Sequence, residues 1–127
     1  MRIVVINTND LHGGAARAAY RLHKGLREIG ENSTYFVKER ATDDTSVEQF
    51  ISDPSPKAVA ERLTLRAQLD AAYDEYAHCR SPDIELFSQE RVDGDEDFFI
   101  QRPRADVINL HWVSRFVDYH LFFTPER

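Results

Sequence analysis

The sequence predicts an α/β fold built on a parallel sheet, and three observations carry this prediction. The run "RIVVIN" is short, apolar and β-branched, without the alternation expected of a strand with one solvent face. A helical pattern follows it, and a second strand-like run, "STYFVKE", comes next. Strand, helix and strand within about 40 residues make one right-handed βαβ unit. We therefore expect a Rossmann-like parallel sheet with flanking helices.

Apolar residues recur at gaps of four and three after the first strand, which predicts a helix with one apolar face. The expected apolar face consists of Ala15, Ala19, Leu22, Leu26 and Ile29. A charged set at the same gaps is expected on another face: Arg17, Arg21, Lys24 and Glu28. Gly30 stands where a glycine commonly ends a helix.

The remaining elements are predicted from apolar runs and from the prolines and polar stretches that interrupt them. The polar stretch "RATDDTSVEQFISDPSP" contains two prolines and predicts a long loop. A second helix is expected over residues 57–77, and its apolar face should hold Leu65, Leu69, Ala72 and Tyr76. "HCRSPDIELFSQERVDGDEDF" is expected to be irregular, "DFFIQRP" to start as a short helix, and "ADVINLHW" to form a third strand.

Three predicted strands make a thin sheet for a chain of 127 residues. We therefore expect residues 1–127 to form a single N-terminal domain that continues into a longer protein. The tail "VSRFVDYHLFFTPER" is rich in aromatic residues, which are expected to be exposed as an interface with a further domain or with a second copy in a homodimer. These residues are Phe116, Tyr119, Phe122 and Phe123.

Composition argues against several function classes. A net charge of −6 makes a nucleic-acid partner unfavourable, because phosphate binding needs a surplus of Lys and Arg. The opening apolar run is shorter than a signal-peptide core, and no window approaches a membrane span. The single Cys79 excludes an internal disulfide and is typical of a cytoplasmic protein.

No metal site is expected. The five histidines and the one cysteine show no ligand spacing. The acidic motif "DGDED", residues 93–97, resembles the start of a calcium loop but has Phe98 at the sixth position and Arg104 at the twelfth. An EF-hand needs Gly and Glu there, so a solvated acidic loop is the better interpretation.

The pair Gly13-Gly14 lies between the first strand and the first helix. Free N–H groups at a helix start favour an anion, and glycine lets a phosphate approach the backbone closely. The dinucleotide and P-loop glycine patterns are both absent, which disfavours nicotinamide cofactors and P-loop ATP chemistry. The alternative is a pair of glycines that only makes a tight turn, and the pattern leaves both interpretations open.

His111 ends the third predicted strand in "NLHW". Ligands of open α/β sheets bind beyond the carboxyl ends of the strands, so Gly13, Gly14 and His111 are expected at one edge of the sheet. The alternative for His111 is a histidine packed beside Trp112.

Two segments carry a resemblance to a known family. "INTNDLHGGAARAAYRLHKGLREIGENSTYFV" and "ADVINLHW" resemble the N-terminal half of family 4 glycosyltransferases. More narrowly, they resemble the bacterial enzymes of colanic acid and other exopolysaccharide synthesis. The likeness covers residues 1–45 and 104–123, with "GGAARAAYRL" as its most specific part, and residues 46–102 take no part in it.

The resemblance implies half of a GT-B fold, in which two Rossmann-like domains face each other across a cleft. The N-terminal domain would hold a glycan or lipid-linked acceptor, and the C-terminal domain the nucleotide-sugar donor. Gly13, Gly14 and Ala15 would lie near the donor diphosphate, and His111 would approach the transferred sugar as a catalytic residue. Transfer would retain the anomeric configuration without a metal or cofactor, with the nucleotide-sugar as co-substrate. Asn109 stands where the family strand has its first histidine, so no role is carried over to it.

In this interpretation the C-terminal domain lies beyond Arg127, and the chain alone is expected to be inactive. The resemblance also allows peripheral association with the inner face of the membrane. The alternative is a stand-alone Rossmann-like module that binds an anion, a nucleotide or a protein without catalysis. A nicotinamide-type fold with Glu39 on a ribose is disfavoured, because the glycine fingerprint is missing.

Overall fold

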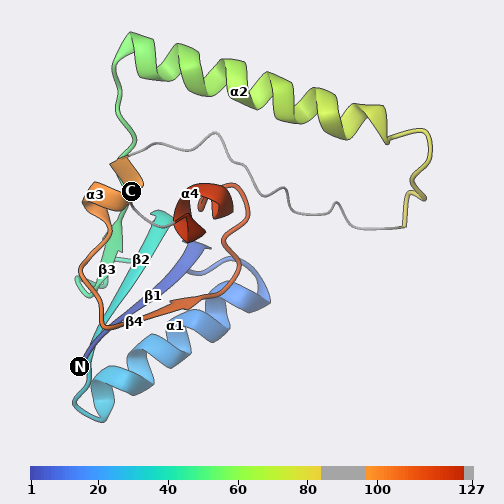
Figure 1. Ribbon diagram of the computed structural model, residues 1–127. Coiled ribbons are helices and arrows are strands. Elements are labelled where there is room, and N and C mark those ends of the chain that lie inside the picture. Colours follow the sequence, from blue (N-terminus) through green and yellow to red (C-terminus); the bar gives the residue numbers. More distant parts are fainter. Residues whose placement is uncertain (84–96, 125–127) are drawn as a thin grey trace.

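The sheet of this protein is parallel throughout. The computed structural model describes residues 1–83 and 97–124, and within them four strands pair in the order β3-β2-β1-β4 (Figure 1). The strands are β1 Arg2–Asn9, β2 Asn32–Glu39, β3 Val47–Gln49 and β4 Val107–Leu110. The predicted α/β class is confirmed, with the expected three strands and one more.

β1 lies in the middle of the sheet and is buried on both faces, as its unbroken apolar run predicts. On one face, helix α1 (Gly13–Glu28) covers β1 and β2. The core on that face consists of Ile3, Val5, Ala19, Tyr35, Val37 and Val47. The core on the other face is largely aromatic and consists of Val4, Ile6, Phe36, Phe50, Phe98, Val113, Phe116 and Val117.

The predicted apolar face of α1 is right for Ala19 and Leu26, which pack against the sheet, and wrong for Ala15, Leu22 and Ile29, which are exposed. The buried residues are Ala16, Ala19 and His23, whereas Leu22 is 38% exposed and Ile29 76% exposed. The cause is His23, which is polar but fully buried because both of its ring nitrogens have hydrogen-bond partners. A pattern of apolar residues cannot include such a side chain in the core.

The predicted end of α1 at Gly30 is confirmed. Gly30 has a φ of +88°, and its N–H donates to the Arg27 carbonyl at 3.0 Å. The Glu31 N–H donates to the Leu26 carbonyl at 2.9 Å. This pair of bonds is the Schellman motif, which needs the left-handed backbone that glycine adopts readily.

The loop predicted between residues 40 and 56 contains a short strand, which corrects the prediction. β3 has only three residues and pairs in parallel with β2, with Tyr35 opposite Val47. Residues 40–46 form the connection between these parallel strands; we call them the crossover. Parallel neighbours usually need a longer, helical connection. Neither such a connection nor an apolar run is present in this polar stretch, so the sequence did not indicate a strand. Hydrogen bonds to side chains hold the crossover, as described below.

The second predicted helix is confirmed as α2, Pro56–Glu75, and its start is capped by Ser55, which accepts from the Ala58 N–H. Its predicted apolar face is not a buried one, because none of its residues is buried and Tyr76 just beyond it is 54% exposed. Figure 1 shows α2 set apart from the sheet. Within the described residues, no helix combines the length and apolar character that crossing a membrane requires.

The short helix predicted at "DFFIQ" is confirmed as α3, Asp97–Gln101, and a further short helix, α4, spans Tyr119–Phe123. The expectation of four exposed aromatic residues in the tail is wrong for Phe116, which is 4% exposed and belongs to the aromatic core. Tyr119 and Phe122 pack partly against the same core, and Phe123 is 67% exposed. Most of the segment predicted to be irregular, and of the "DGDED" motif, lies outside the described residues.

Candidate functional site

The carboxyl ends of β1 and β4 form the topological switch point of the sheet. From β1 the chain moves outward to β2 and β3, and it then returns past β1 to β4 on the other side. Ligands of open α/β sheets bind at such a point. Gly13, Gly14 and Ala15 follow β1, and His111 follows β4, its direct neighbour. The structure thus places Gly13, Gly14, Ala15 and His111 beyond the carboxyl ends of two neighbouring strands, as the sequence suggested; we call this end of the sheet the carboxyl edge.

Four consecutive polar residues at the end of β1, "NTND", organise this edge. Asn7, Thr8, Asn9 and Asp10 are all buried, with exposed fractions between 0% and 9%. Their side chains form hydrogen bonds with three segments: the residues after β4, the turn into α1 and the crossover. Sequence reasoning missed these roles; the signal was a run of four polar residues directly after a buried apolar strand.

Asn7 and Thr8 fix the segment that follows β4. The Trp112 N–H donates to Oδ1 of Asn7 at 2.8 Å, and the Asn7 carboxamide donates to the Asn9 carbonyl at 2.6 Å. The Thr8 hydroxyl lies 2.8 Å from the Ser114 carbonyl, to which it can donate. The residues beside His111 are therefore held to the end of β1 by side chains of β1 itself.

Asn9 and Asp10 fix the other two segments of the edge. The His12 N–H donates to Oδ1 of Asn9 at 2.7 Å, which shapes the turn into α1. The Asp10 carboxylate is fully buried and accepts from the N–H groups of Ala41 and Thr42, at 3.0 and 2.8 Å. Asp10 thereby joins the crossover to the end of β1, beside the glycine loop.

The two glycines of the loop differ in what they do. Gly13 has a φ of +87°, so the turn requires a backbone conformation that glycine adopts readily at this position. Gly14 has an ordinary backbone, and a Cβ at this position would meet no atom within 4 Å. The tight-turn interpretation therefore explains Gly13 and leaves Gly14 without a conformational reason.

The start of α1 is open. Its N-cap residue, His12, makes no side-chain cap, and the first turn contains no acidic residue. Gly13, Gly14 and Ala15 are exposed. The first N–H groups of a helix have no partner within the helix and carry its positive dipole end. An anion could reach them here without displacing a side chain.

Alanine substitutions should separate the two glycines. Gly13→Ala is expected to lower the free energy of unfolding by about 1–2 kcal/mol, because an L side chain is strained at this φ. Gly14→Ala should leave it unchanged or raise it by up to about 1 kcal/mol, because alanine restricts the unfolded chain. Urea denaturation monitored by circular dichroism measures both. A loss of stability in Gly14→Ala comparable to that in Gly13→Ala would mean that the fold itself needs Gly14.

His111 is anchored through its backbone and has a free ring nitrogen. Its N–H donates to the Ile6 carbonyl at 2.9 Å, which continues the β1–β4 pairing. Nε2 is buried and has no hydrogen-bond partner among the described residues. Burial lowers the pKa of the imidazole below its ordinary value, which favours the neutral ring. His111 is half-buried, and the neighbouring Trp112 is 54% exposed.

Comparison with known proteins found no family model, no curated protein and no solved structure that matches the chain.

Proposed function

We propose that this chain is the acceptor-side half of a retaining glycosyltransferase that moves a sugar from a nucleotide-sugar to a glycan or lipid-linked acceptor. The observation that supports the proposal is the placement of the open glycine loop and His111 on neighbouring strands at the switch point. The resemblance of the loop and of β4 to exopolysaccharide glycosyltransferases supplies the reaction.

The chemistry of the edge fits the demands of this reaction. When the bond between the sugar and the diphosphate breaks, negative charge develops on the departing phosphate oxygen. N–H groups fixed at the start of α1 can stabilise that charge without reorganising. The missing side chain of Gly14 leaves room for the phosphate to approach the backbone. In this proposal the transferred sugar lies beside the neutral ring of His111, and a shift of this ring or of the segment after β4 makes the buried, unpartnered Nε2 accessible to it.

Binding of the diphosphate is the first test. Titration of the protein with UDP, GDP or ADP, followed by amide NMR shifts, should move the signals of Gly14 and Ala15 most. Gly14→Val should weaken the binding at least tenfold, because its side chain occupies the path of the phosphate. Gly25→Val is the matched control: Gly25 lies in the same helix, and a Cβ there also meets no atom within 4 Å. Equal binding by the two variants would remove the loop from the site.

Catalysis is the second test, made with the product of the complete reading frame. His111→Ala is expected to lower the rate of sugar transfer about 100-fold, with little change in the unfolding midpoint. A variant that mainly unfolds would assign His111 to packing. Diphosphate binding at the loop without any sugar transfer by the complete protein would instead favour the stand-alone anion-binding module.

A further inference from the structure

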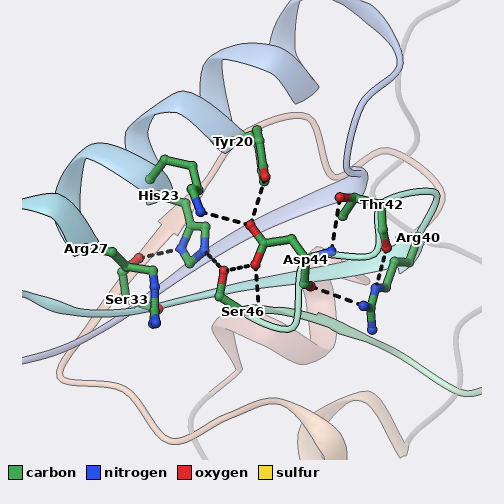
Figure 2. A network of polar contacts seen from close by, with 9 residues as sticks. Tyr20, His23, Arg27, Ser33, Arg40, Thr42, Asp44 and Ser46 are labelled. Atoms are coloured by element: carbon green, nitrogen blue, oxygen red, sulfur yellow. Dashed lines mark hydrogen bonds and ion pairs between the residues drawn. The ribbon is translucent and has the colours of Figure 1, made fainter.

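His23 occupies an unusual position for a titratable side chain. It is fully buried in the interface between α1 and the sheet. Nδ1 lies 2.9 Å from the Ser33 hydroxyl at the start of β2, and Nε2 lies 2.8 Å from the Ser46 hydroxyl of the crossover (Figure 2). The imidazole therefore connects α1, β2 and the crossover, away from the carboxyl edge that carries the candidate site.

Asp44 fixes the direction of these hydrogen bonds. Its Oδ1 accepts from both the backbone N–H and the hydroxyl of Ser46, at 2.9 and 2.6 Å. Its Oδ2 accepts from the Tyr20 hydroxyl at 2.8 Å and from the Lys24 ammonium at 3.1 Å. The hydrogen bonds from Ser46 and Tyr20 hold the pKa of Asp44 well below its usual range, so this carboxylate is ionised.

The proton of the imidazole can then be assigned. The only hydrogen of the Ser46 hydroxyl goes to Asp44, so Ser46 must accept from the N–H of His23 at Nε2. Nδ1 is therefore the acceptor, and the Ser33 hydroxyl donates to it. A second proton on the ring would convert Nδ1 from acceptor to donor. The Ser33 hydroxyl hydrogen would then lose the acceptor that the structure records for it.

The surroundings also oppose a charged ring. Lys24 and Arg27 of α1 are the nearby cations, and Asp44 of the crossover is the nearby anion, already paired with Lys24. The rings of Tyr20 and Tyr35 complete the contacts, with centroids 6.4 and 5.9 Å from the imidazole. Burial, followed by the charge of Arg27, lowers the pKa of His23 to about 4.

We propose that His23 is an acid-sensitive latch: a second proton on its imidazole releases the crossover, residues 40–46, from α1 and β2. The release would spread in two directions. β3 starts at Val47, directly after Ser46, and pairs with β2. At the other end, the crossover N–H groups that Asp10 binds belong to Ala41 and Thr42. Acid would thus loosen the crossover where Asp10 binds it, beside the glycine loop.

The pH window follows from the two states of His23. The released or unfolded ring has the ordinary pKa near 6.5, and the latched ring one of about 4. The latch is therefore at full strength above pH 6.5, and it weakens as the pH falls toward 4, because only the released state takes up the proton. As the pH falls through this window, the equilibrium constant for release of the crossover should rise by about two orders of magnitude.

Native-state hydrogen exchange tests the latch. After correction for intrinsic rates, protection of the Val47 and Phe50 amides should fall between pH 7 and pH 5, while that of Val5 in β1 changes less. His23→Gln should remove this difference, because a carboxamide can donate to Ser46 and accept from Ser33 without titrating in this range. His120→Gln, at an exposed histidine of α4, is the matched control and should behave as the wild type.

Two results would overturn the proposal: an unchanged pH dependence in His23→Gln, or equal losses at Val5 and Val47 in the wild type. If His23→Gln does not fold, an NMR titration of the wild-type ring decides. A proton on Nε2 and a pKa well below 6.5 support the latch; a proton on Nδ1, or an ordinary pKa, refutes it.

Discussion

Replacing Phe116 by alanine is expected to lower the free energy of unfolding by about 3–5 kcal/mol. The ring is 4% exposed, and its centroid lies 5.2 Å from that of Phe98 and 5.8 Å from those of Phe36 and Phe50. Truncation therefore removes a large apolar side chain and leaves a cavity among three other rings. Urea denaturation followed by far-UV circular dichroism measures the loss.

Phe123→Ala provides the control, because this residue of the same tail is 67% exposed and should change stability by no more than about 0.5 kcal/mol. Sedimentation of both variants distinguishes a core residue from an interface residue. If Phe116→Ala kept its stability and instead dissociated a dimer, the original expectation of an exposed interface would be right and the buried position wrong.

Asp10→Ala is expected to lower the free energy of unfolding by about 3 kcal/mol, which is the second large effect. The carboxylate is fully buried, and its removal leaves the Ala41 and Thr42 N–H groups without their acceptor. Asp10→Asn keeps an acceptor oxygen but loses the charge, so its cost should be smaller. Asp43→Ala removes an exposed carboxylate from the crossover and should be nearly neutral. Equal stability of Asp10→Ala and Asp43→Ala would show that Asp10 does not hold the crossover.

Asp10→Ala should also lower the protection of the crossover amides at pH 7, where His23 is neutral. This measurement separates the two sets of hydrogen bonds that hold the crossover: those of Asp10 to Ala41 and Thr42, and that of His23 to Ser46, which is lost when the ring takes up a second proton.

The sequence could predict the elements whose signal is local. β1, β2 and β4 are apolar runs, and Gly30 ends α1 through its own backbone conformation. The shared edge of Gly13 and His111 also follows from sequence, because the carboxyl ends of parallel strands lie together.

The features that could not be predicted depend on partners distant in sequence. His23 is buried because Ser33 and Ser46 satisfy its ring, and nothing near His23 announces those contacts. β3 has one buried apolar residue, Val47, in a polar stretch, so its pairing is decided by β2. The roles of Asn7 and Asp10 require residues 105 and 31 positions away.

The central position of β1 has a consequence for how the chain reaches its native state. One of its two neighbouring strands, β2, is close in the sequence, because only one helix separates it from β1. The other, β4, is distant: Arg2 of β1 and its partner Asp106, just before β4, are 104 residues apart. As the chain leaves the ribosome, one side of β1 is paired early and the other stays bare until residue 107 has emerged. A bare edge of this kind invites pairing with other chains. The late arrival of β4 therefore makes the time between synthesis of β1 and β4 the period of greatest aggregation risk, and it raises the contact order that slows folding.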